Sequence, residues 1–287
     1  MTTINGQPVA LSPDRIENRP SDLLPAKGQK DAAGHRQLSV FGVPISALTM
    51  GELLSMIDGW IVRRERHYLC TLDVHALMES QSAPDVRRIY QSASIVTPDG
   101  VPLVWLLRRA GYRQADRICG PDLMPALFER SQHGGYRHFL YGASENTLAL
   151  LKRNLVARFP AATIVGCYSP PYRALTAQEE RDTVNRLNDA APDIVWVGLG
   201  APKQDRWMGA YRVKLNAPVL IGVGAAFDMM AGTVKRAPRF MQRTGCEWAF
   251  RVMQEPGRLW RRYLGCNSRF AIMLVNEQLR QLRGQRA

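Results

Sequence analysis

Six short apolar runs, separated by segments with helical periodicity, constrain the fold of this chain more than any other feature. The runs occupy residues 67–74, 93–99, 136–143, 162–168, 193–200 and 217–227. Nearly continuous apolar strands are typical of parallel sheets, because helices cover such sheets on both faces. The pattern therefore predicts an α/β fold, in which a Rossmann-like, mainly parallel sheet has helices on both faces.

Two further segments flank the predicted α/β domain, which we place at residues 37–233. Residues 1–36 are rich in polar residues, Pro and Gly and lack sustained hydrophobic periodicity, so we expect a disordered N-terminal extension. Residues 234–287 carry arginines among apolar residues, which predicts a basic, amphipathic and helical C-terminal appendage.

Positive charge is concentrated in this appendage. Between Ala231 and the end of the chain there are twelve Lys and Arg residues and three Glu residues, a net +9 of the formal +13. Such a surface suits phosphates or an anionic membrane. A nucleic-acid-binding protein is an alternative interpretation, since Arg and aromatic residues also bind phosphates and stack on bases.

The cysteines and the hydropathy bear on location. Five cysteines form no CxxC pair and leave an odd count, which favours reduced thiols in a cytoplasmic protein. No apolar stretch has the roughly 18 to 20 residues needed to span a bilayer, and the start lacks the apolar segment of a signal peptide. We therefore expect a cytoplasmic protein.

The residues that follow the apolar runs are the candidates for a binding site, because ligands of open parallel sheets lie beyond the carboxyl ends of the strands. Asp99 follows the second run on a Thr-Pro-Asp-Gly turn. Residues 142–146 offer backbone N–H groups and a helix start that can receive an anion. The exits at 198–205 and 222–228 are rich in small residues, and together these exits indicate a nucleotide-type ligand.

Familiar nucleotide and metal motifs are incomplete or absent in the sequence. A GxGxxG motif fails at Lys203 and Phe227, which leaves an NAD-linked oxidoreductase as a weakly supported alternative. There is no GxxxxGK[ST] loop, no DxD pair and no HExxH pair. We therefore predict no cofactor and no metal site.

Arginine can supply the positive charge that a phosphate leaving group otherwise takes from a metal. Arg251, Arg258 and Arg261 are spaced by seven and three residues, which on a helix places them along one side, although Pro256 should bend or restart that helix. Guanidinium groups bind diphosphates through paired hydrogen bonds. A solvated basic face is the alternative explanation.

Seven short sequence motifs, taken in this order along the chain, resemble those of a known family; we call them blocks. The blocks are Thr71, 98–100 (Pro-Asp-Gly), 120–123 (Gly-Pro-Asp-Leu), 198–205 (Gly-Leu-Gly-Ala-Pro-Lys-Gln-Asp), 222–228 (Gly-Val-Gly-Ala-Ala-Phe-Asp), 235–238 (Lys-Arg-Ala-Pro) and 247–256 (Glu-Trp-Ala-Phe-Arg-Val-Met-Gln-Glu-Pro). Over about residues 38–270 the chain is similar to the WecG/TagA/CpsF glycosyltransferases, glycosyltransferase family 26. The resemblance implies an inverting, metal-independent transfer from a UDP-sugar to a polyprenyl-diphosphate-linked saccharide in cell-surface polysaccharide biosynthesis, exopolysaccharide included.

The resemblance also implies roles for individual residues. Asp99 becomes the general base that deprotonates the acceptor hydroxyl, with Thr71 beside it in the pocket. A helix-capping role is the alternative for Asp99. Gln204 and Asp228 fall on the nucleotide side, where they can reach uracil or ribose, and helix-start or turn roles are their alternatives. The resemblance places the three arginines against UDP.

Asp73 departs from the family pattern, which usually has asparagine two residues after the threonine. A carboxylate lacks the amide donor and adds negative charge near a diphosphate, so it can alter donor choice or the pKa values of the pocket. Asp73 can also compete with Asp99 for the role of base. His75 lies nearby in the sequence, and we expect it to be structural.

The expected partners are a UDP-sugar, a polyprenyl-diphosphate-linked acceptor and a membrane surface, and we expect no nucleic acid. The resemblance allows glucose, N-acetylmannosamine or its uronic acid as the transferred sugar. Apolar residues of the appendage can lie at the inner face of the bacterial plasma membrane or belong to the core. These residues are Trp248, Phe250, Met253, Leu259, Trp260, Tyr263 and Leu264. The sequence is compatible with a homo-oligomer.

Overall fold

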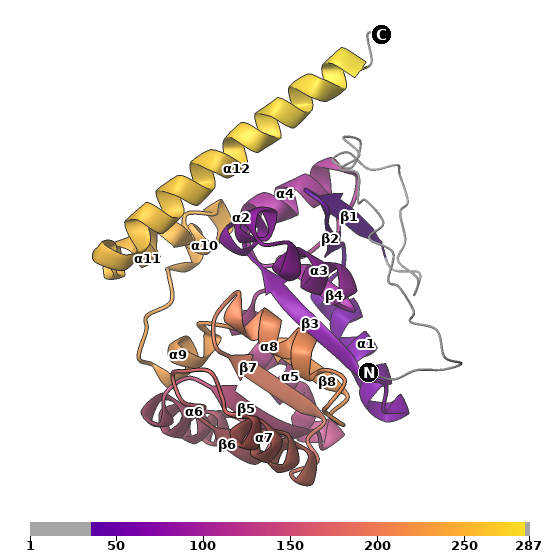
Figure 1. The fold of residues 1–287 in the computed structure, drawn as a ribbon, viewed down its shortest axis with the longest axis vertical. Helices are drawn as coiled ribbons and strands as arrows, with labels where there is room; N and C mark the ends of the chain where they lie inside the picture. Colours follow the sequence, from indigo (N-terminus) through magenta and orange to yellow (C-terminus); the bar gives the residue numbers. More distant parts are fainter. Residues whose placement is uncertain (1–35, 285–287) are drawn as a thin grey trace, which may run out of the picture.

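The computed structural model describes residues 36–284, apart from the side chains of 258–259, 261–264, 278 and 280–284. Figure 1 shows an α/β body with a long helix at the C-terminal end. Nearly all of the expected N-terminal extension, 1–36, lies outside the described residues.

Six parallel strands form the central sheet of the body, in the order β4-β3-β8-β7-β5-β6. The strands are β3 (His67–Leu72), β4 (Ile95–Pro98), β5 (Arg137–Gly142), β6 (Thr163–Tyr168), β7 (Ile194–Gly198) and β8 (Val219–Gly222). Each falls in one of the six apolar runs, so the predicted parallel α/β sheet is confirmed.

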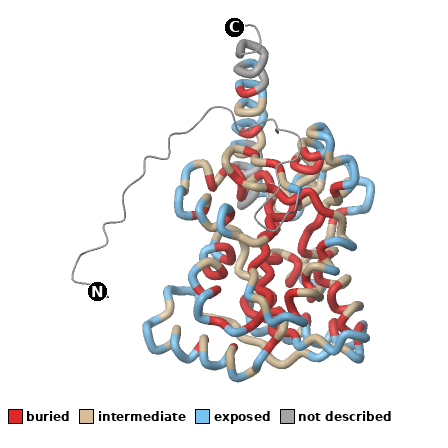
Figure 2. The backbone as a smooth tube through the Cα atoms, turned by 90° about the vertical axis from the view of Figure 1, so that its right-hand side faces the viewer, coloured by how far each residue is buried: buried red, intermediate tan, exposed pale blue. Residues whose placement is uncertain are grey.

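Helices pack on both faces of this sheet, and the side chains of a strand alternate between the two cores. In β7, Val195 and Val197 belong to one core, whereas Ile194 and Trp196 belong to the other. Figure 2 shows that the buried parts of the chain concentrate in the middle of the body. Because both faces are covered, apolar residues at successive strand positions are all buried, which explains the continuous apolar runs.

The two cores are built from different helices. One contains α1 (Met50–Arg63), α5 (Gly120–Gly134), α6 (Glu145–Arg158) and α9 (Ala226–Ala231). The other contains α2 (Val74–Ser82), α3 (Pro84–Ser92), α4 (Val101–Arg109), α7 (Ala177–Asp189) and α8 (Lys203–Tyr211), together with the antiparallel strands β1 (Gln37–Val40) and β2 (Val43–Ser46).

The last part of the chain is helical, as predicted. It consists of α10 (Arg239–Thr244), α11 (Glu247–Gln254) and α12 (Pro256–Gly284). Pro256 starts α12, so the expected interruption is a restart of the helix, which agrees with the tolerance for proline in a first helical turn. Midway along α12, Phe270 is buried and packs edge-on against Phe41, with ring centroids 6.1 Å apart. Beyond this contact α12 extends past the body (Figure 1).

Candidate active site

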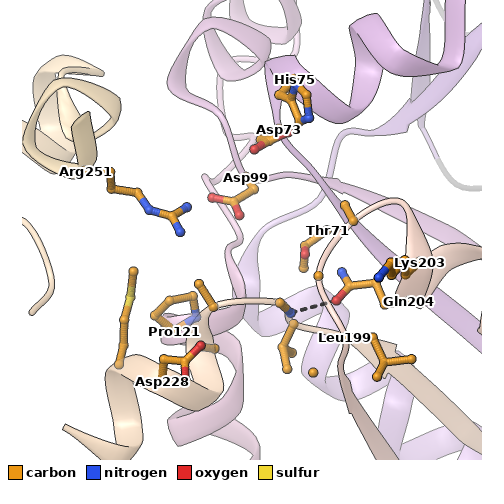
Figure 3. A pocket seen from close by; sticks show the side chains of 18 of the residues that line it. Thr71, Asp73, His75, Asp99, Pro121, Leu199, Lys203, Gln204, Asp228 and Arg251 are labelled. Atoms are coloured by element: carbon orange, nitrogen blue, oxygen red, sulfur yellow. Dashed lines mark hydrogen bonds between the residues drawn. The ribbon is translucent and has the colours of Figure 1, made fainter. Parts of the chain in front are cut away.

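The carboxyl ends of the strands open into a cavity of about 1340 Å³, which the appendage helix α11 also lines (Figure 3). Six of the eight site residues predicted from the sequence line it: Thr71, Asp73, Asp99, Gln204, Asp228 and Arg251. The remaining two, Arg258 and Arg261, lie in α12, but their side chains are outside the part of the chain that the structure describes. The cavity therefore gathers predicted residues that are up to 180 positions apart in the sequence.

Asp99 lies directly after β4 and is held there by the main chain. Its N–H donates to the carbonyl of Leu72 in the neighbouring strand β3, at 2.9 Å. The side chain is 28% exposed, and its Oδ1 accepts a hydrogen bond from Nη2 of Arg117 at 3.1 Å. The N-cap of the following helix is Gly100, without a side-chain cap, so the carboxylate of Asp99 is not used as a helix cap.

The surroundings of Asp99 raise the pKa of its carboxyl to about 6. Burial is the main cause, and the carboxylates of Asp73 and Glu247 add to the rise, while the guanidinium of Arg117 opposes it. A carboxylate with a pKa in this range is still ionised at neutral pH and is a stronger base than an ordinary aspartate. A raised pKa inside a cavity is typical of functional groups.

Arg117 and Glu247 join the site although the sequence analysis assigned neither a role. Arg117 donates from Nε to the backbone carbonyl of Asp99 and from Nη2 to Oε2 of Glu247, the latter at 2.6 Å. Glu247 is the first residue of α11, so this guanidinium connects the β4 exit to the appendage. The sequence contains only weak signals for these two roles: Glu247 is the first residue of the family motif at 247–256, and Arg117 lies three residues before the motif at 120–123.

Thr71 and Asp73 lie at the end of β3. The Thr71 hydroxyl donates to the carbonyl of Gly222 in β8 at 2.9 Å, which leaves its lone pairs to accept from a ligand. Asp73 is the N-cap of α2, and its Oδ1 accepts from the N–H of Ala76 at 2.7 Å. Asparagine caps helices about as well as aspartate, so the cap does not explain why this chain has a carboxylate here.

His75 lies where α2 contacts α12. Its Nδ1 lies 3.1 Å from Sγ of Cys266 on α12, and its Nε2 lies 3.8 Å from the carboxylate of Glu79. His75 also lines the cavity, so the structural role that we expected for it stays a prediction.

Gln204 and Asp228 lie on the β7 and β8 side of the cavity. Gln204 is buried, and its Oε1 accepts a hydrogen bond from the N–H of Gly224 at 2.9 Å. A Cβ at Gly222 would lie 3.0 Å from the Gln204 amide nitrogen, so the glycine allows this close approach. The Asp228 backbone carbonyl accepts from the Thr233 hydroxyl at 3.0 Å. Both residues thus have local structural contacts in addition to lining the cavity.

Arg251 reaches the cavity from α11, on the side opposite the strand exits (Figure 3). The three predicted arginines do not share one helix, because α11 ends at Gln254 and α12 begins at Pro256. Over the described ranges, no three His, Cys, Asp or Glu side chains are grouped so that they could hold a metal ion. Within residues 36–284, no helix has the length and apolar character needed to cross a membrane.

Comparison with known proteins gives consistent results. Residues 38–284 match the sequence model of the glycosyl transferase WecG/TagA/CpsF family. A protein of Bacillus spizizenii (strain ATCC 23059 / NRRL B-14472 / W23), named N-acetylglucosaminyldiphosphoundecaprenol N-acetyl-beta-D-mannosaminyltransferase, is 30% identical over 211 residues, which cover 74% of this chain and 80% of the relative. A protein of the same name from Bacillus subtilis (strain 168) is 29% identical over 232 residues, covering 78% and 88%.

Proposed function

The chain belongs to the WecG/TagA/CpsF glycosyltransferase family, and from this membership we propose that it transfers N-acetylmannosamine from a UDP-sugar to a polyprenyl-diphosphate-linked N-acetylglucosamine. Both relatives are named for N-acetylmannosaminyl transfer to such an acceptor, which favours this sugar over glucose or the uronic acid. As a glycosyltransferase, the chain is neither an NAD-linked oxidoreductase nor a simple nucleic-acid-binding protein.

The observation that carries the proposal is the environment of Asp99. An inverting transfer needs one base that takes the proton of the acceptor hydroxyl while the oxygen forms a bond to the anomeric carbon. The bond from that carbon to the UDP oxygen breaks in the same step. Asp99 has a raised pKa, lines the cavity and accepts two hydrogen bonds from Arg117, one at its backbone carbonyl and one at its carboxylate, and these features support its role as the base. Thr71 accepts a hydrogen bond from a bound sugar.

The leaving UDP carries the negative charge that develops in the transition state. We assign its stabilisation to Arg251, Arg258 and Arg261 without a metal ion, and nucleotide binding to Gln204 and Asp228. In this arrangement residues 37–233 form the catalytic domain and residues 234–287 close over the donor. Full activity in the presence of EDTA is the expected result, and strict dependence on a divalent cation would contradict it.

The polyprenyl acceptor requires the protein to work at a membrane surface, which we propose to be the inner face of the plasma membrane. Large apolar side chains are exposed along the appendage, where arginines accompany them, an arrangement suited to anionic lipid. They include Phe240, Met253, Trp260, Ile272, Val275 and Leu279. Sedimentation with anionic vesicles, but not with neutral ones, is expected, and equal binding to both would contradict the role of charge.

Asp99→Asn tests the proposal directly. The amide has nearly the same shape but cannot take up the proton, so turnover should fall about 10²- to 10⁴-fold. Donor affinity, measured by titration calorimetry with UDP, should change little. An Asp99→Asn enzyme that transfers N-acetylmannosamine at nearly the wild-type rate would show that another group is the base.

A further inference from the structure

A second cavity, of about 470 Å³, lies between α4 and α10. Its lining is dominated by arginine: Arg108 comes from α4, Arg117 from the loop before α5, and Arg239 and Arg243 from α10. Arg117 already pairs with Asp99 and Glu247, whereas Arg108, Arg239 and Arg243 give the cavity an excess of positive charge that favours a bound anion.

The acids near this cavity leave three of its arginines, Arg108, Arg239 and Arg243, without a carboxylate among the described residues. Asp122 is the one carboxylate in its described lining, and Arg236 already binds both of its oxygens, at 2.6 and 2.8 Å. Arg108 donates to a neutral backbone carbonyl, that of Ala115. Among the described residues, neither Arg239 nor Arg243 is paired with an acid. The cavity is therefore positively charged, and its groups match phosphate oxygens, which guanidinium binds through paired hydrogen bonds.

The second cavity meets the first one beside the proposed base. Val101, Trp105 and Arg117 line both cavities, and Arg117 is the residue that binds Asp99. A phosphate group in the second cavity and a sugar hydroxyl at Asp99 can thus belong to one ligand. At this junction α4 and the end of α10 are in close contact, because a Cβ at Gly245 would lie only 3.2 Å from Cβ of Val101.

Each of the two helices that line the second cavity carries an exposed aromatic side chain: Trp105 belongs to the lining, and Phe240 neighbours the lining residue Arg239 in sequence. Trp105 is 56% exposed on α4, and Phe240, between the arginines of α10, is 67% exposed. Exposed aromatic side chains next to a phosphate site suit a ligand whose diphosphate continues into a hydrocarbon chain. A nucleotide alone would leave these side chains unused.

We propose that the second cavity binds the diphosphate of the polyprenyl-linked acceptor. The inference rests on the proposed function and adds to it a separate site for the lipid substrate. The acceptor sugar extends past Arg117 to Asp99 in the larger cavity, where Arg251 faces the UDP-sugar. The polyprenyl chain leaves over Trp105 and Phe240. The two diphosphates of the reaction are thereby held by different arginines, on either side of the joint between α10 and α11.

The test is the double variant Arg239→Ala/Arg243→Ala, assayed with N-acetylglucosaminyl diphosphate on a short, water-soluble isoprenoid and without vesicles. The KM for this acceptor should rise ~10- to 100-fold, because two charge-assisted contacts are lost, while kcat and the KM for the UDP-sugar stay close to wild type. The matched control is Arg109→Ala/Arg113→Ala, which removes the same charge from exposed positions near α4 that line neither cavity. Thermal unfolding should be alike in both variants.

A second acceptor separates the diphosphate contact from other causes. With N-acetylglucosamine carried on an uncharged alkyl group, wild type and the α10 double variant should have the same KM, since no diphosphate is present. An equal rise of KM for both acceptors, or an equal effect of the control variant, overturns the inference. If wild-type enzyme transfers N-acetylmannosamine to neither acceptor, the proposed function itself fails, which is a different outcome.

Discussion

The α/β body and the appendage supply polar groups to one cavity in different ways. In the body, Thr71 lies near the end of a buried parallel strand and Asp99 and Gln204 lie beyond the ends of two others, and hydrogen bonds to backbone groups hold all three in place. In the appendage, no described side chain of α10 or α11 is buried. A side chain that transfers a proton needs a fixed geometry, whereas positively charged side chains that stabilise a departing diphosphate can move into place when the substrate binds. We therefore expect the body to determine the proton transfer and the appendage to provide movable positive charge.

Arg251→Ala should have the largest effect of the changes that probe this division. Loss of one cation that stabilises the leaving group should lower kcat/KM about 10²- to 10³-fold, the size of effect seen when one group that stabilises transition-state charge is removed. The pH at which activity is half-maximal on the acid side should stay the same, because the base is untouched. Steady-state kinetics between pH 5 and 8 measure both quantities.

Arg269→Ala is the matched control for this variant. Arg269 also belongs to the appendage, but its guanidinium bonds Ser82 of α2 and does not line the cavity. Its removal should leave kcat/KM within about twofold of wild type, in line with other surface changes. Equal losses in the two variants would mean that the appendage acts only through its net charge.

Glu247→Gln tests a contact between the two regions inside the site, the ion pair of Glu247 with Arg117. The carboxylate of Glu247 contributes to the raised pKa of Asp99, so the neutral amide should lower that pKa. The base then stays ionised to lower pH, and the acid side of the kcat/KM profile moves to lower pH. A weaker base and a looser α11 should together reduce kcat roughly tenfold at neutral pH.

Arg117→Gln should move the same profile in the opposite direction. Its guanidinium lowers the pKa of Asp99, so without it the carboxyl is protonated at higher pH and activity is lost earlier on acidification. Opposite shifts would confirm that an appendage residue and a body residue act on the same base. Identical profiles for wild type and both variants would contradict the coupling.

The difference between the two regions also explains which strands and site residues could be predicted from the sequence and which could not. The six strands were predictable because burial on both faces requires continuous apolar runs. Asp99 was a candidate site residue because of its place at a strand exit, and the family resemblance implied its role as the base. The role of Arg117 was not predictable, because this residue lies in an irregular segment and gains its role from a contact with Glu247, 130 positions away in the sequence. No local periodicity encodes such a pair.

The start of the body shows the same limit. Strands β1 and β2 have only four residues each, and their pairing depends on a turn at Phe41 and Gly42, both with positive φ. Runs this short cannot be distinguished from loop sequence by periodicity. Likewise, the second arginine cavity was not predictable, since it requires α10 to fold back against α4.

Asp73→Asn should have the smallest effect, and it tests the assignment of roles within the body. Asparagine keeps the cap on α2, so the stability should change by less than about 0.5 kcal/mol, whereas Asp73→Ala should lose about 1 kcal/mol. The carboxylate of Asp73 contributes to the raised pKa of Asp99, so the amide should move the acid side of the activity profile to lower pH with only a few-fold change in kcat. Thermal unfolding and pH-dependent kinetics measure the two effects.

The contradicting outcome is that Asp73→Asn abolishes transfer while Asp99→Asn retains it. The base would then be Asp73, at the end of β3. In that case the asparagine that the family usually has at this position could not replace Asp73 in this chain without loss of activity.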